Sequence, residues 1–174
     1  MTTARIARLV LTACLAGVAA CSSPAQNPQA PPPPTIAPGL MNASVDGNGW
    51  SAGGLSGSPA AAAYSGASIL IVGHRIFANG SGSNVTLHVE AFTGAGTYSL
   101  STGALSGARA IFASYTAALD TTKYTTDAGH TGTLTVTLFD GINRNVKGTF
   151  SFTGLDGTGT VVANVTSGVF DVSF

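Results

Sequence analysis

Charged side chains are scarce in this 174-residue chain, at 8% of the total, and glutamate occurs once, at position 90. Binding to nucleic acid or to an anionic membrane surface requires clustered Lys and Arg. Beyond the first twenty residues the basic side chains are scattered, at Arg75, Arg109, Lys123, Arg144 and Lys147. The composition therefore excludes a nucleic-acid partner.

Cysteine is almost missing, with only Cys14 and Cys21 in the chain. If the first twenty residues are removed, one cysteine remains and no internal disulfide can form. Removal of Arg5 and Arg8 also leaves five basic against seven acidic residues, a net charge of about −2. We expect the remaining chain to depend on its hydrophobic core for stability.

Long apolar runs are missing too, and the longest N-terminal one extends from Leu9 to Ala20. It is too short for the roughly 20 residues of a transmembrane helix. A basic segment precedes it and small residues end it, as in a secretory signal peptide. We therefore predict a signal peptide over residues 1–20. A second possible cleavage site, before Cys14, would leave too short an apolar region.

The segment Val18-Ala19-Ala20-Cys21 resembles the bacterial lipobox. That resemblance implies lipidation of Cys21 with a diacylglyceryl group and usually an N-linked acyl chain such as palmitate, followed by cleavage just before it. Two chains are what stable anchoring requires, so the expected partner is a membrane, reached through this lipid. Ser22 and Ser23 do not resemble the acidic residue that retains many such lipoproteins at the inner membrane, which favours the outer membrane.

Prolines dominate the segment that follows, SSPAQNPQAPPPPTIAPG, over residues 22–39. An uncharged, proline-rich chain without large apolar residues forms an extended, semi-rigid spacer. We therefore predict a lipidated linker over 21–40 and one folded domain over 41–174, which is large enough to bury a core.

The domain shows alternation of apolar and polar residues with period two, typical of half-buried antiparallel strands. No stretch has apolar residues at helical spacing. The sequence therefore predicts an all-β antiparallel sandwich or small barrel. The expected strands are Ile69–Val72, covered on both sides, and Val85–Glu90, Gly96–Leu100, Ala108–Ala117, Thr133–Leu138, Gly148–Phe152 and Val161–Phe174.

Several short motifs are similar to those of an uncharacterised family of small all-β bacterial lipoprotein domains. They include Asp46-Gly-x-x-Trp50, Gly96-Thr-Tyr-Ser-Leu100, Thr131-Gly-Thr-Leu-Thr-Val-Thr137, Lys147-Gly-Thr-Phe-Ser-Phe152 and Gly168-Val-Phe-Asp171. The resemblance implies fold and location, and it carries over no catalytic residue.

A possible serine nucleophile lies in Gly49-Trp-Ser-Ala-Gly53, which matches the G-x-S-x-G elbow of hydrolases. Asp120 or Asp127 and then His130 follow in the order that a hydrolase triad needs. The elbow requires a helix directly after the serine, and the glycine-rich segment here predicts none. We therefore expect no catalytic residues, and a hydrolase is the weakest alternative.

Two histidines could hold a metal ion if the hairpin around Asn79–Asn84 were symmetric about Ser81. His74 and His88 would then face each other across two strands, with Glu90 nearby as a third ligand. A shift of one residue in the register would separate them. We keep His74 and His88 as weak metal candidates and expect no cofactor. The Asp-Gly pairs at 46, 140 and 156 are expected to form turns.

These observations favour a lipid-anchored envelope domain with a non-enzymatic binding or structural role. A barrel that binds a small apolar ligand is the alternative, and a serine hydrolase comes third.

Overall fold

The computed structural model describes residues 34–54, 58–101 and 107–174. The prediction of an all-β domain is confirmed, because every regular element among these residues is a strand. The expected signal peptide, Cys21 and most of the linker lie outside the described residues.

Eleven strands form one hydrogen-bonded sheet. They are β1 (Leu40–Val45), β2 (Asn48–Ala52), β3 (Ala60–Ser65), β4 (Ser68–Ile76), β5 (Gly82–Val89), β6 (Gly96–Leu100), β7 (Ala108–Tyr115), β8 (Thr121–Thr125), β9 (Gly132–Asp140), β10 (Asn145–Asp156) and β11 (Val162–Ser173).

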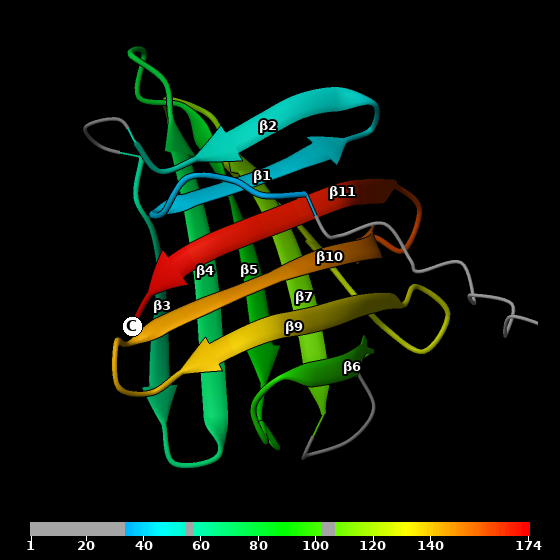
Figure 1. The fold of residues 1–174 in the computed structure, drawn as a ribbon. Coiled ribbons are helices and arrows are strands. Elements are labelled where there is room, and N and C mark those ends of the chain that lie inside the picture. Colours follow the sequence, from blue (N-terminus) through cyan, green and yellow to red (C-terminus); the bar gives the residue numbers. More distant parts are fainter. Residues whose placement is uncertain (1–33, 55–57, 102–106) are drawn as a thin grey trace, which may run out of the picture. The chain divides into compact units, whose positions relative to one another are not determined.

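The sheet bends over itself into two crossing layers (Figure 1). Its strand order is β2-β1-β11-β10-β9-β6-β7-β5-β4-β3. β6 joins the layers, because it pairs antiparallel with β9 and, through Leu100 and Ala108, parallel with β7. β8 makes a second link, since it pairs with both β7 and β10. The two layers are therefore closed along one side, while β2 and β3 are the free edges.

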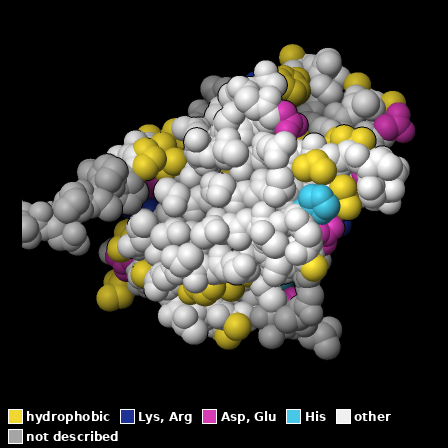
Figure 2. Space-filling view, turned by 90° about the vertical axis from the view of Figure 1, so that its right-hand side faces the viewer, with side chains coloured by type: hydrophobic (Ala, Val, Ile, Leu, Met, Phe, Trp, Pro, Cys, Tyr) yellow, Lys and Arg dark blue, Asp and Glu magenta, His cyan; other side chains and the backbone are white. Residues whose placement is uncertain are grey.

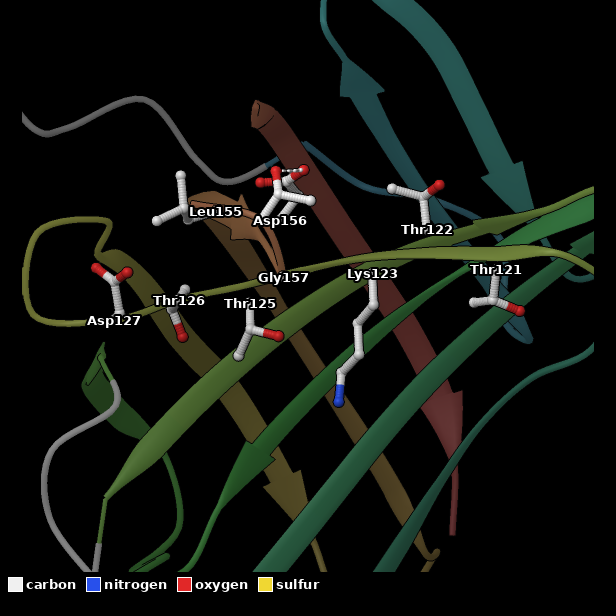
Figure 3. A pocket seen from close by; sticks show the side chains of 10 residues that line it. Thr121, Thr122, Lys123, Thr125, Thr126, Asp127, Leu155, Asp156 and Gly157 are labelled. Atoms are coloured by element: carbon white, nitrogen blue, oxygen red, sulfur yellow. Dashed lines mark hydrogen bonds between the residues drawn. The ribbon is translucent and has the colours of Figure 1, made fainter. Parts of the chain in front are cut away.

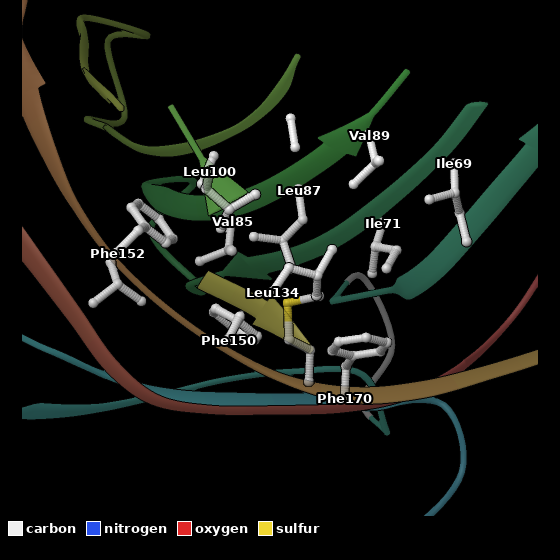
Figure 4. Close-up of a cluster of buried hydrophobic side chains, with 14 of the residues drawn as sticks. Ile69, Ile71, Val85, Leu87, Val89, Leu100, Leu134, Phe150, Phe152 and Phe170 are labelled. Atoms are coloured by element: carbon white, nitrogen blue, oxygen red, sulfur yellow. The ribbon is translucent and has the colours of Figure 1, made fainter. Parts of the chain in front are cut away.

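Alternating apolar residues from both layers meet in one core. Val85, Leu87 and Val89 of β5 are buried, as the alternation predicts, and they lie across from Leu134 of β9 and Phe170 of β11 (Figure 4). Burial of each such side chain contributes roughly 1.5–3 kcal/mol. The side chains occupy the space between the layers, where a ligand-binding barrel would hold its ligand.

One predicted alternation breaks in the middle of β9. Leu134 and Val136 are buried, but Leu138, expected on the same face, is 40% exposed. The register with β10 shifts here, since Lys147 pairs with Leu138 and the next residue, Gly148, pairs with Val136. This β-bulge adds one residue to β9 and reverses the direction of the side chains that follow.

The bulge turns Phe139 inward, into an aromatic cluster at one end of the layers. Its ring centroid lies 5.0 Å from that of Tyr64, 5.0 Å from that of Phe92 and 5.2 Å from that of Phe174. The contacts with Tyr64 and Phe92 are edge-to-face and that with Phe174 is stacked, and aromatic pairs of these kinds stabilise by roughly 0.5–1.5 kcal/mol each. The cluster joins β3 of one layer to β9 and the C-terminal residue of the other.

The strand expected over Ile69–Val72 is present but is covered on one side only. Ile69 and Ile71 are fully buried, whereas Leu70 is 37% exposed. The expectation of cover on both faces was therefore wrong, because the outer face of the β3–β4 layer carries no further element among the described residues.

Candidate functional site

A groove lined by threonine and charged side chains lies beside β8, one of the two strands that link the layers. It has a volume of about 670 Å³ and runs along β8 to the turn after β10 (Figure 3). We call it the threonine groove. Its lining residues are Thr121, Thr122, Lys123, Thr125, Thr126, Asp127, Leu155, Asp156, Gly157 and Thr158.

The close approach of β8 to β10 gives the groove its floor. Thr125 pairs with Leu155, and Tyr124 pairs with Asp156. A Cβ atom at Gly154 would lie 3.0 Å from the backbone carbon of Tyr124, so the missing side chain permits this approach. On β8, Thr121, Lys123 and Thr125 point to one side and Thr122 to the other (Figure 3).

Thr126, just after β8, is an anchor rather than a ligand contact. Its side chain is fully buried. Its hydroxyl accepts a hydrogen bond from the backbone N–H of Ala110 at 3.0 Å, and its own N–H donates to the Ala110 carbonyl at 3.1 Å. These bonds fix the end of β8 against β7 and hold the groove open.

The carboxylate of Asp156, at the end of β10, accepts hydrogen bonds from the turn that follows. One oxygen accepts hydrogen bonds from the N–H groups of Thr160 and Val161, at 3.0 and 3.1 Å, and the other accepts from the Thr158 hydroxyl at 2.7 Å. The Thr158 hydroxyl, followed by the N–H of Val161, lowers the pKa of Asp156 below its ordinary value. This carboxylate is ionised at neutral pH and is therefore no general acid.

Asp127 pairs with His130 at the other end of the groove. Its Oδ1 lies 2.9 Å from His130 Nδ1 and also accepts the N–H groups of Gly129 and His130. The side-chain bond to His130 is the main reason that the pKa of Asp127 lies below its ordinary value. Of the expected hydrolase residues, these two therefore do meet.

The expected nucleophile does not join them. Ser51 is an exposed residue within β2, with no helix after it in the described residues. The histidine side chains bond elsewhere: His74 to Tyr115, His88 to Ser68 and His130 to Asp127. No hydrogen bond links Ser51 to a histidine among the described residues, so no triad forms around it there.

The prediction that His74 and His88 face each other was wrong. His74 pairs with Asn84, and His88 pairs with Leu70. Because the turn spans 77–81 and not 79–84, the two positions lie four residues, about 13 Å, apart along β5. Among the described residues no three His, Cys, Asp or Glu side chains gather as a metal site would require.

The Asp-Gly pairs form turns, as expected. Asp46 and Gly47 both have positive φ, 48° and 81°, and connect β1 to β2 as a two-residue hairpin turn. Asp140 accepts the N–H groups of Ile142 and Asn143 at 3.0 and 2.9 Å.

Sequence reasoning missed the threonine groove and the burial of Asp171. This carboxylate, 3% exposed, lies 2.8 Å from Lys147 Nζ and 2.9 Å from Asn145 Nδ2. Pro34 and Ile36 line a hollow that Lys147 and Asp171 also line.

The face seen in Figure 2 carries few charged side chains, in keeping with a chain of which 8% of the residues are charged. Within the described part of the chain, no helix is both long and apolar enough to span a bilayer.

A family of domains of unknown function (DUF6252) matches residues 38–172. No curated protein and no solved structure matches the chain.

Proposed function

Because the chain belongs to an uncharacterised domain family, DUF6252, we propose a function from its own residues: a lipid-anchored bacterial envelope lipoprotein with a non-enzymatic β domain. The observation that carries this proposal is the order of segments before the domain. A basic segment, a short apolar run, small residues, Cys21 and a proline-rich spacer follow one another.

The position of the first strand supports a spacer of this kind. β1 begins at Leu40, directly after the proline-rich stretch, and pairs with β11 near the end of the chain. The spacer contributes no strand in its described part, residues 34–39, so it can separate the domain from a lipid surface. An extended proline-rich chain rises about 3.1 Å per residue.

The threonine groove supports binding rather than catalysis. Its two carboxylates are ionised and already accept hydrogen bonds from their own turns, so neither can act as a general acid. Threonine hydroxyls both donate and accept hydrogen bonds. The groove therefore suits a partner that offers hydroxyl or amide groups.

Two cysteine variants test the anchor against a matched control. The intact mass of the membrane-extracted protein is expected to begin at Cys21 and to include the lipid, and Cys21→Ser is expected to abolish both lipid and membrane partition. Cys14→Ser, which changes the other cysteine, should leave both unchanged. A mature form that begins elsewhere, or membrane partition that survives Cys21→Ser, would overturn the proposal.

A separate variant tests the expected location at the outer membrane. An acidic residue after the lipidated cysteine is the retention signal that Ser22 does not resemble. Ser22→Asp is therefore expected to move the protein from the outer-membrane to the inner-membrane fraction on a density gradient, while Ser22→Thr should not. An inner-membrane location of the unchanged protein would contradict this part.

A further inference from the structure

β3 is an edge strand without the usual protection against strand pairing. It ends the strand order and, among the described strands, pairs only with β4. Natural edge strands are blunted by charged side chains, prolines, bulges or a covering element. β3 has the sequence AAAAYS, is regular in its pairing with β4, and is largely exposed. No Asp, Glu, Lys or Arg occurs anywhere from Asn48 to Gly73.

The hydrogen-bond pattern shows which backbone groups β3 presents at its free edge. The N–H of His74 donates to the carbonyl of Pro59 at 2.8 Å, which makes 59 and 74 a hydrogen-bonded pair. Such pairs alternate along an antiparallel ladder. Residues 61, 63 and 65 therefore bond to β4, and Ala60, Ala62 and Tyr64 direct their N–H and C=O groups outward.

The other free edge, β2, is partly protected against strand pairing. It has five residues, and Arg75 Nη1 donates to the carbonyl of Gly49 at 3.2 Å. The Gly49 carbonyl is one of the outward groups of β2, because Asn48, Trp50 and Ala52 bond to β1. A charged side chain from the other layer therefore covers part of the β2 edge, whereas no described side chain does so at β3.

The proline-rich segment of the chain itself is a poor occupant for the β3 edge. An added strand must supply N–H donors at every second residue, and proline has none. Prolines recur throughout residues 22–34, at 24, 28 and 31–34. A charged partner strand gains nothing here either, because β3 offers no counter-charge.

A second copy of β3 is complementary to the first. We propose that two molecules pair through β3 in an antiparallel, two-fold arrangement centred on Ala62. In this register Ala62 faces Ala62 of the partner, and Ala60 faces Tyr64, so the outward N–H and C=O groups of all three residues are satisfied in both chains. The alanine side chains leave the approach open, and the aromatic cluster around Tyr64 keeps β3 in place.

Disulfide trapping tests the register in a full chain that carries Cys14→Ser and Cys21→Ser, purified in a non-ionic detergent. Directly opposed residues of a hydrogen-bonded pair have Cα atoms about 5.5 Å apart, within the range for a disulfide. Ala62→Cys is therefore expected to form a covalent dimer under mild oxidation. Ala61→Cys should not, because residue 61 faces residue 63 of the partner and its own equivalent lies beyond about 7 Å.

Light scattering on the same cysteine-free chain tests the dimer itself. The expected protein mass is twice 17.2 kDa. Ala63→Lys, at an exposed position, is expected to give monomers with an unchanged unfolding midpoint, whereas Ser151→Lys, equally exposed on β10, should remain dimeric. If Ala63→Lys unfolds the chain, Ala62→Pro replaces it, because it removes only an outward N–H.

Three results would overturn the proposal: a monomeric unchanged chain, open-ended aggregates in place of dimers, or Ala61→Cys that crosslinks as readily as Ala62→Cys. None of them depends on the lipid anchor, because the tested chain lacks Cys21.

Discussion

Trp50 stabilises the domain by apolar packing and by one buried hydrogen bond. It is 5% exposed, its ring lies over Gly73, and its Nε1 donates to Ser83 Oγ at 2.8 Å. Ser83 itself is buried. The absence of a side chain at Gly73 is required here, since a Cβ would lie 2.8 Å from the Trp50 ring.

Trp50→Phe is expected to lower the free energy of unfolding by about 1–3 kcal/mol, because Ser83 keeps a buried hydroxyl without its donor. Urea denaturation followed by circular dichroism measures the change, since the substitution removes the only tryptophan. In the double variant with Ser83→Ala the loss should be smaller than the sum of the single losses. Strictly additive losses would show that the bond contributes nothing.

Carboxylates in the turns between strands make the stability of the folded state depend on pH. Asp140, the last residue of β9, has its pKa lowered from an ordinary value of 3.8, first by the N–H of Asn143 and then by the Asn143 side chain. The folded state therefore favours the ionised carboxylate. This contribution to stability is complete above the unfolded pKa and is lost as the pH falls through the lower folded value.

Asp140→Asn is expected to reduce the loss of stability between pH 6 and pH 3, because the asparagine oxygen still accepts the turn N–H groups but does not titrate. The urea midpoint at several pH values measures this. Asp120→Asn is the matched control, because no described group donates a hydrogen bond to the Asp120 carboxylate. If both variants change the pH profile equally, the turn bonds of Asp140 are not the cause.

Sequence reasoning found most strands because a two-residue period requires only that one face be buried. It could not locate the bulge in β9, since the residues on both sides of Thr137 continue a plausible alternation. It missed β3 because four alanines carry no strand pattern. The register of His74 depended on where the β4–β5 turn lies, and several residues of Asn79-Gly-Ser-Gly-Ser-Asn84 suit a turn equally well.

Among the candidate site residues, hydrogen bonds between residues close in sequence could be predicted, and contacts between distant segments could not. The Asp-Gly turns follow from residues two to five positions apart, and the structure confirms them. The threonine groove depends on β8 reaching β10, and the contacts of the buried Asp171 depend on Lys147 and Asn145 of β10. The contact of β8 with β10 arises only when the sheet bends over itself, whereas Lys147 lies opposite Asp171 in the pairing of β10 with β11.

At the scale of the whole molecule, the first and last strands hold each other in place. β11 pairs with β1 along Leu40–Val45 and with β10 along most of its length. The pairing of β1 with β11 closes a loop that contains all the other strands. We therefore expect slow folding, in the range of milliseconds to seconds typical of sheets with distant pairings. The same topology makes β11 essential, since its loss would leave the β1–β2 hairpin without a strand that joins it to the rest of the sheet.

A chain that ends at Val161 is therefore expected to lack a cooperative unfolding transition. It loses Val165, Phe170 and Val172, which are at most 1% exposed and contribute roughly 1.5–3 kcal/mol each. That loss is comparable with the 5–15 kcal/mol that stabilises a typical domain. Deletion of residues 22–33, a segment of similar length before the first strand, should shift the free energy of unfolding by less than about 0.5 kcal/mol. Urea denaturation monitored by Trp50 fluorescence compares the two, and a cooperative transition in the shortened chain would mean that β10 alone completes the layer.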